Sequence, residues 1–183
     1  MVDVNPAEAL RSLRRTRQVR EFTDEPVSRE DLDALADVAR WTGSGRNSQP
    51  WRFIVVTDAP TIRELATAGL PQTRSLHTAT AFIAIVLPVD DEHDIGLAYD
   101  DGRVAERILI AAGILGLGAG IAWIRDDVRH AVGELLGLPP DRYVRTITAL
   151  GHPTEAALAP KSEPGKARLP RDQTVFEERW PEG

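Results

Sequence analysis

The sequence predicts one β-sheet covered on both faces by helices. Segments rich in β-branched and aromatic residues, typical of strands, alternate along the chain with segments whose apolar residues have helical spacing. The length of 183 residues suits one domain, and 42% hydrophobic residues are enough for a core. Residues 108–124 carry no charge. We interpret them as a buried helix followed by a buried strand, because a membrane span needs about 20 apolar residues.

The N-terminal part is predicted to hold two helices joined by an extended piece. Asn5 followed by proline is typical of a capped helix start, and the apolar spacing predicts a helix over 6–15. Residues 18–22 follow as an extended piece. Ser28 begins a pattern that resembles a capping box and predicts a second helix that closes near Trp41.

The middle of the chain is predicted to alternate strands and helices. Residues 42–50 are polar or turn-forming and predict a loop. The β-branched and aromatic segment 51–57 predicts a central strand. A short helix near 60–69 and a second strand over 81–88 follow, and the acidic residues 90–94 predict a solvated turn.

The remaining elements complete the predicted sheet. A long helix over 98–117 ends in glycines and leads into a strand over 119–124. Asp126 is expected to cap a further helix, which the prolines of 138–140 end. Residues 143–150 alternate as the last strand. The proline-rich tail that follows has few apolar residues, so it predicts an arm laid over another surface or a disordered segment.

Composition and patterning exclude several classes of function. The net charge of −6 argues against a nucleic-acid partner, and the absence of cysteine excludes disulfides, thiolate catalysis and cysteine-bound metals. The isolated histidines predict no metal site. The N-terminus lacks a secretion pattern, so a cytoplasmic location is expected, without membrane insertion. The glycines of 116–120 follow a helix and precede a strand, which is the reverse of the dinucleotide-binding order.

Three clusters are candidates for ligand binding. Residues 11–20 hold five arginines, the natural partners of phosphate, although only two of the 22 cationic residues are lysines and arginine is the default cation here. The loop 43–51 offers amide side chains that suit the edge of a heteroaromatic ring, or it is a surface turn. The segment 166–170 pairs a lysine with an arginine, as a phosphate clamp or as solubilising charges.

Together these clusters resemble the nitroreductase family of FMN-dependent NAD(P)H oxidoreductases. The resemblance is carried, in order, by 17–22, by 43–51 ahead of a strand, by 100–112 and by 166–170, and it extends from about residue 9 to residue 171. It implies an α+β fold, a nitroreductase-like three-layer α/β/α sandwich with a mostly antiparallel sheet flanked by helices.

The resemblance also implies a division of the chain and an assembly. Residues 1–153 would form the FMN-binding domain, and residues 154–183 an extended, domain-swapped C-terminal arm that packs on the partner subunit of a homodimer. Where the family usually has Gln-Asn after Ala-x, this chain has Glu106 and Arg107, which are expected to form an ion pair at the dimer seam. Residues 90–99 leave no room for a helical excursion, so the substrate pocket is expected to be open.

The family resemblance implies cofactor-binding residues and no catalytic side chain. Cations from both ends of the chain would hold the FMN phosphate and ribityl chain, and the loop would contact or support the flavin ring. A glutamine would lie near the reactive ring nitrogen, and the end of a strand would lie along the isoalloxazine. The implied set is Arg17, Gln18, Arg20, Ser44, Arg46, Asn47, Gln49, Gln72, Trp123, Ile124, Lys166 and Arg168.

The implied function is transfer of hydride from NAD(P)H to small oxidised acceptors, such as nitroaromatics or quinones, by a ping-pong mechanism. The alternative is a relative of the same fold that consumes or only binds flavin. A basic-helix interaction module built on residues 11–20 is disfavoured, because the chain is acidic overall and this segment is embedded in the predicted domain.

Overall fold

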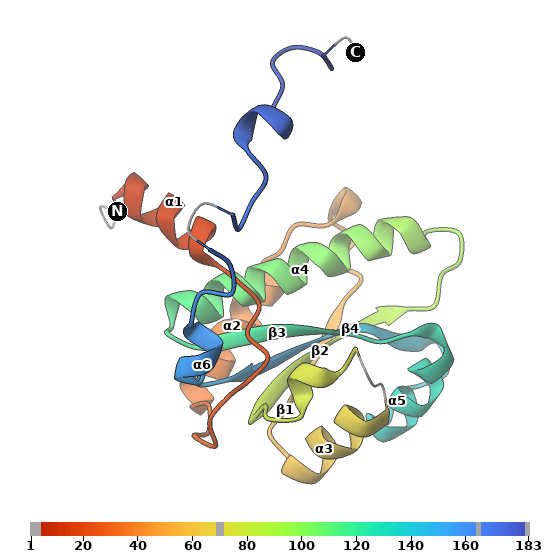
Figure 1. The fold of residues 1–183 in the computed structure, drawn as a ribbon. Helices are drawn as coiled ribbons and strands as arrows, with labels where there is room; N and C mark the ends of the chain where they lie inside the picture. The colour runs from red at the N-terminus through yellow and green to blue at the C-terminus, as the bar shows by residue number, and fades with distance from the viewer. Residues whose placement is uncertain (1–4, 69–71, 164–165, 182–183) are drawn as a thin grey trace.

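The four strands of the sheet are all antiparallel. The computed structural model describes residues 5–68, 72–163 and 166–181. Within them the strands β1 (Arg52–Val56), β2 (Ala81–Pro88), β3 (Gly118–Trp123) and β4 (Arg142–Gly151) form one sheet in the order β1-β2-β4-β3. The sheet is the middle layer of the molecule in Figure 1. The predicted α+β fold with a mostly antiparallel sheet is confirmed.

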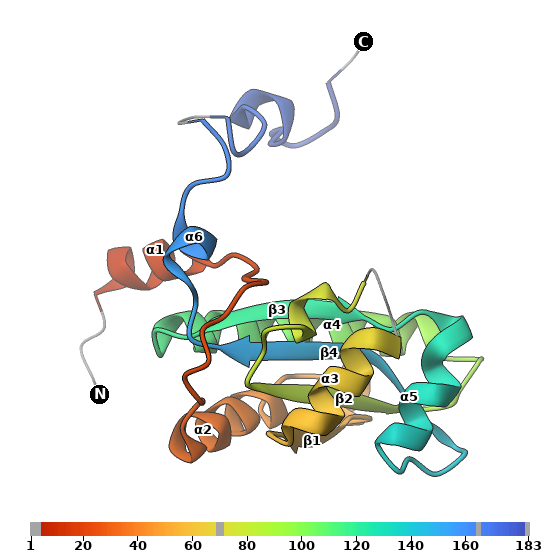
Figure 2. The ribbon, with the colours of Figure 1, turned by 60° about the horizontal axis from the view of Figure 1, so that its bottom comes forward.

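Helices cover both faces of this sheet. α2 (Arg29–Arg40) and α4 (Asp94–Ile114) pack on one face, and α3 (Ala59–Ala68) and α5 (Arg129–Leu135) pack on the other, as Figure 2 shows. The alternation of β2 serves both layers. Ile83 and Ile85 point into the first core, between the sheet and α2 and α4. Phe82 and Ala84 point into the second core, between the sheet and α3 and α5. The three-layer sandwich expected from the sequence is therefore present.

Local capping fixes the first two helices where the sequence predicted them. The Asn5 side chain accepts a hydrogen bond from the Ala7 amide at 3.0 Å and begins α1 (Pro6–Arg15). Ser28 Oγ accepts from the Asp31 amide at 3.0 Å and donates to its carboxylate at 2.7 Å. Both caps satisfy amides that the first helical turn leaves without partners.

Two boundaries differ from the prediction. α4 begins at Asp94, inside the predicted turn, and ends before Gly116, whose φ of +77° closes the helix. An aspartate in the first turn is favoured by the helix dipole, and a sequence pattern built on apolar spacing does not register it. The prediction that Asp126 caps a helix is wrong. Asp126 begins a short 3₁₀ turn and forms an ion pair with Arg129 at 2.7 Å.

The segment after α1 crosses the edge of β3, and glycines make room for it. The Val19 amide donates to the Ala119 carbonyl at 2.8 Å, and Phe22 forms an isolated bridge with Pro153. A Cβ on Gly120 would lie 2.1 Å from the Val19 carbonyl oxygen. The lack of a side chain at Gly120 of β3 thus allows the segment after α1 to pack directly on this strand.

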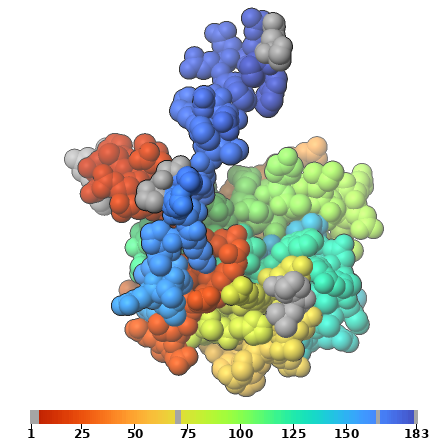
Figure 3. All heavy atoms as spheres, in the orientation of Figure 1, coloured from red at the N-terminus to blue at the C-terminus, as the bar shows by residue number. Residues whose placement is uncertain are grey.

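α1 and the C-terminal arm stand out from the rest of the molecule, as the space-filling view in Figure 3 shows. α1 buries none of its residues, and Leu10 and Leu13 are 59% and 49% exposed. The short helix α6 (Glu155–Leu158) begins the arm. Within the described residues, no helix is both long and apolar enough to cross a membrane.

Candidate functional site

A cavity of about 410 Å³ lies at the outer edge of β3, the edge away from β4. Its walls come from the extended segment after α1, from the turn that follows α3, and from β3 itself. The lining residues are Gln18, Arg20, Gln72, Arg74, Ile121 and Trp123. The structure thus brings together four residues predicted from the sequence and adds Arg74 and Ile121, which the prediction missed.

Alternation along the extended segment decides which of its side chains reach this cavity. Successive side chains of an extended chain point to opposite sides. Gln18 and Arg20 line the cavity at the edge of β3, whereas Arg17 and Val19 line a second cavity of about 350 Å³. The sequence prediction placed Arg17, Gln18 and Arg20 in one site, and within this chain Arg17 faces away from the other two.

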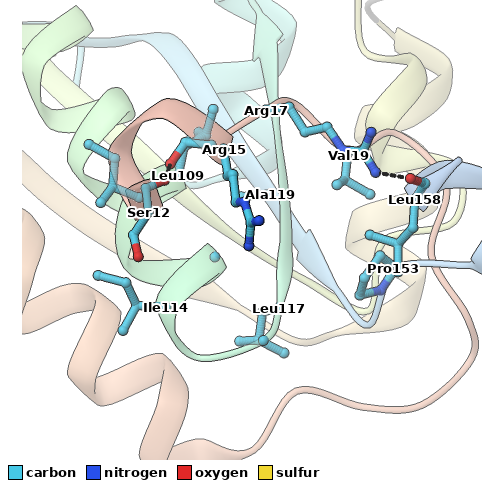
Figure 4. A pocket seen from close by; sticks show the side chains of 14 residues that line it. Ser12, Arg15, Arg17, Val19, Leu109, Ile114, Leu117, Ala119, Pro153 and Leu158 are labelled. Atoms are coloured by element: carbon cyan, nitrogen blue, oxygen red, sulfur yellow. Dashed lines mark hydrogen bonds between the residues drawn. The ribbon is translucent and has the colours of Figure 1, made fainter. Parts of the chain in front are cut away.

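The second cavity lies between α1, the end of α4 and the start of the arm (Figure 4). The Arg17 guanidinium hydrogen-bonds the carbonyl oxygens of Leu158 and Ala159 at the end of α6. A cation suits the carbonyl end of a helix. Arg17 therefore ties the beginning of the arm to the domain, and its contact with a phosphate stays a prediction.

Gln18 uses one end of its amide to close the edge of β3. Its Oε1 accepts from the Ile121 amide at 3.4 Å and from Arg20 Nη2 at 3.0 Å. Its Nε2 has no hydrogen bond in the part of the chain that the structure describes. Since a side-chain amide has two donor hydrogens, the donor end of Gln18 is available to a ligand in this cavity.

The turn after α3 places a buried acceptor and a cation at the cavity. Thr73 Oγ1 donates to the Ala66 carbonyl at 2.8 Å and ties Thr73 to the last turns of α3. Gln72 Oε1 is buried and has no partner among the described residues. Buried amide oxygens without a partner are rare and point to a missing ligand or water. Arg74 pairs loosely with Glu21, at 3.6 Å, and its side chain stays 71% exposed.

The predicted amide-rich loop has a strained backbone. Arg46, Asn47 and Gln49 have φ of +52°, +55° and +47°, in the left-handed region. Each such residue costs on the order of 1–3 kcal/mol, and such residues cluster at functional sites. Ser44 Oγ accepts from the Gln49 amide at 2.8 Å, and Trp51, 4% exposed, anchors the end of the loop in the core.

The loop presents its polar side chains to solvent. Arg46, Asn47 and Gln49 are all exposed, and none of them lines the cavity at the edge of β3. The side chains of Arg46 and Asn47 make no hydrogen bond or ion pair within the described ranges. Their contact with a flavin stays a prediction.

The other predicted residues also lie outside the cavity. Lys166 and Arg168 are exposed on the arm, where Lys166 pairs with Glu163 and Arg168 bonds the neighbouring carbonyl of Ala167. The Ile124 side chain is fully buried in the second core, and its amide donates to the Arg145 carbonyl at 2.8 Å. Ile124 as a whole is 0% exposed, so its contact with a cofactor stays a prediction.

A buried carboxyl group lies next to the strand end that carries Trp123. Trp123 is paired in register with Thr146 of β4, whose hydroxyl donates to Asp101 Oδ2 of α4 at 2.6 Å. Asp101 is 4% exposed, and burial raises its pKa to about 6, although the Thr146 hydrogen bond and the nearby Arg145 act against this rise. Burial thus favours the neutral form of Asp101 over the charged one.

The fold and the cavity define an α+β protein whose site suits an anionic ligand with a flat polar ring. The nitroreductase family model matches residues 13–85. An oxygen-insensitive NADPH nitroreductase from Salmonella typhimurium is 32% identical over 181 residues, which cover 90% of this chain and 71% of that protein. An FMN reductase [NAD(P)H] from Bacillus subtilis is 29% identical, over 94% of this chain and 74% of that protein.

Solved structures show the same relationship. A protein from Desulfovibrio desulfuricans, solved in complex with FMN, superposes with a TM-score of 0.79 at 27% identity, and covers 97% of this chain and 99% of that one. The chain belongs to the nitroreductase family. The family and the fold expected from the sequence are confirmed.

Proposed function

We propose that the chain is an FMN-dependent oxidoreductase that takes hydride from NAD(P)H and passes it to small oxidised acceptors such as nitroaromatics or quinones. Ping-pong order is part of the proposal, since one open cavity would serve donor and acceptor in turn. The relatives named above support the cofactor and the nicotinamide donor. The cavity at the edge of β3 is the observation in this chain that supports it most directly.

The residues of this cavity fit FMN. A flavin ring offers carbonyl oxygens and a ring N–H along one edge, and its side chain ends in a phosphate. The Gln72 amide lines the cavity and would suit the polar edge of the ring, and the Gln18 Nε2, which has no hydrogen bond among the described residues, would suit a carbonyl. Ile121 and Trp123 supply apolar surface for the ring, and the Trp123 side chain is 49% exposed. When bound, FMN supplies the capacity to accept and release hydride.

The side chains around the cavity bind and orient, and we propose no catalytic residue among them. Arg20 and Arg74 place two permanent positive charges beside the ligand, where they would stabilise negative charge that develops during reduction. The other lining side chains are amides and apolar groups. The chain therefore acts through position and charge, and proton transfer by a lining side chain is not needed.

We propose that the functional unit is a homodimer in the cytoplasm whose C-terminal arms pack on the partner subunit. α1 and the arm leave Leu10, Leu13 and Trp180 exposed, the last at 78%, and these side chains need a surface to cover them. The strained loop and the arm cations also lie away from the cavity of their own chain. A second subunit would supply the surface against which both act.

The connection between β2 and α4 supports an open mouth for acceptors. β2 ends at Pro88 and α4 begins at Asp94, so a short turn joins them, with no space for a covering helix. The proposal therefore includes acceptors of varied shape.

The absorbance spectrum of the purified protein tests the cofactor. A flavin spectrum that bleaches on anaerobic addition of NAD(P)H supports the proposal, and a colourless protein that binds no added FMN contradicts it. Steady NAD(P)H oxidation with a nitroaromatic or a quinone, with parallel lines in double-reciprocal plots, supports ping-pong reduction. Loss of the flavin itself during turnover would instead support a flavin-consuming relative.

Substitution of Arg74 tests the cavity. Arg74→Ala should weaken FMN binding about tenfold, since it removes a charge-assisted contact at a partly solvated position. The matched control is Arg63→Ala, which removes an exposed arginine of α3 that does not line this cavity. Equal FMN dissociation constants for the two variants and the wild type would place the cofactor elsewhere.

A further inference from the structure

Two side chains of α4 reach across to the segment that begins the amide-rich loop. Asp100 Oδ2 accepts a hydrogen bond from the Gly45 amide at 3.3 Å. About two helical turns further along α4, Arg107 Nη1 donates to the Trp41 carbonyl at 3.2 Å. Positions seven residues apart lie on the same side of a helix, so both contacts come from one stripe of α4.

Arg103, which lies on the same stripe of α4, forms an ion pair with Asp100. Arg103 Nη1 donates to Asp100 Oδ1 at 3.3 Å, and Asp100 is 7% exposed. The Arg103 guanidinium also lies against the loop, because a Cβ on Gly43 would be 3.0 Å from its Nη2. The buried carboxylate of Asp100 thus has one oxygen for its arginine partner and the other for the loop.

The loop needs restraints from outside itself. Its three left-handed residues, Arg46, Asn47 and Gln49, follow each other closely, and all three are exposed. Bonds within the loop, such as Ser44 Oγ with the Gln49 amide, close the turn but do not fix it relative to the domain. The hydrogen bonds from Asp100 and Arg107 of α4 fix the position of the loop relative to the domain.

We infer that Asp100 and Arg107 are positioning residues that hold loop 42–50 in the conformation that presents Arg46 and Asn47 to the flavin, Asp100 through Gly45 within the loop and Arg107 through Trp41, which directly precedes it. This inference rests on the proposed function for its ligand, and on the α4 contacts for its geometry. It also gives Arg107 a role within its own chain. The sequence led us to expect an ion pair between Arg107 and Glu106 at a dimer seam, whereas here the guanidinium bonds the Trp41 carbonyl.

Amide hydrogen exchange, read by mass spectrometry on the protein without added FMN, tests the geometry. Asp100→Ala and Arg107→Ala should each raise the exchange rate within residues 42–50 roughly tenfold, with β2 unchanged. Asp100→Asn keeps an oxygen acceptor and Arg107→Lys keeps a donor, so both should stay within about twofold of the wild type. Arg63→Ala is the control for loss of an exposed arginine.

FMN titration of the same variants tests the function of the loop. The two alanine variants should bind FMN about tenfold more weakly, and the conservative variants should restore the affinity. Unchanged exchange in residues 42–50 of folded Arg107→Ala overturns the inference, and so does faster exchange with an unchanged FMN dissociation constant. If the wild type binds no FMN, the proposed function fails on its own, and the exchange result still decides whether α4 holds the loop.

Discussion

Replacing Asp101 by asparagine should change how the stability of the protein depends on pH. Asp101 is 4% exposed, and its Oδ1 has no partner among the described residues. Burial raises its pKa from the ordinary value of 3.8 to about 6. That difference corresponds to on the order of 3 kcal/mol of unfolding free energy. Because the folded pKa is the higher one, this stabilisation is complete below pH about 4 and is lost as the pH rises through about 6.

Urea unfolding of the wild type and Asp101→Asn, at one protein concentration and at several values between pH about 4 and about 7, measures this effect. The asparagine cannot ionise and still offers an oxygen to the Thr146 hydroxyl. The stability of the variant relative to the wild type should therefore grow with pH, by on the order of 3 kcal/mol across the range. Asp91→Asn, which removes an exposed carboxylate, is the control. Parallel curves for Asp101→Asn and the wild type would refute the argument.

Three further predictions concern packing and assembly. Gly120→Ala should destabilise the protein by at least about 3 kcal/mol, because the new Cβ has no room against the Val19 backbone. Gly113→Ala lies in open space on α4 and should stabilise the protein by up to about 1 kcal/mol. Urea unfolding measures both changes, and similar values would contradict the packing described. Phe22→Ala, at a residue 4% exposed, should cost about 3–5 kcal/mol in the same assay. The double change Leu10→Ser and Leu13→Ser should weaken a homodimer at least about tenfold by light scattering, and an unchanged dissociation constant would remove α1 from the interface.

The fold was predictable wherever local chemistry decides it. The caps at Asn5 and Ser28 and the continuous apolar run of β2 place three elements where the sequence expected them. The start of α4 was missed, because Asp94 closes the acidic run 90–94 that the prediction took as a solvated turn, and the first helical turn buries only Leu97. The order of the strands was not readable from periodicity, since pairing between distant strands leaves no local signal; the family resemblance supplied the antiparallel sheet.

The candidate site was predictable in part, for a geometrical reason. The family motifs located Gln18, Arg20, Gln72 and Trp123, which the fold brings to one cavity. Arg74 was missed because the prediction treated the turn as a single contact at residue 72. Ile121 could have been found from Trp123 by the two-residue period of a strand. The predicted loop and arm residues lie outside this cavity in the single chain, and their contact with the cofactor stays a prediction.

The extended segment after α1, residues 18–22, also affects solubility. β3 is an outer strand, and outer strands with free amides and carbonyls can pair with other molecules and aggregate. Here the Val19 amide occupies the Ala119 carbonyl, and Gln18 Oε1 occupies the Ile121 amide. The same short segment thus shields the sheet from unwanted pairing and lines the ligand cavity. Damage to this segment should therefore bring loss of ligand binding and precipitation together.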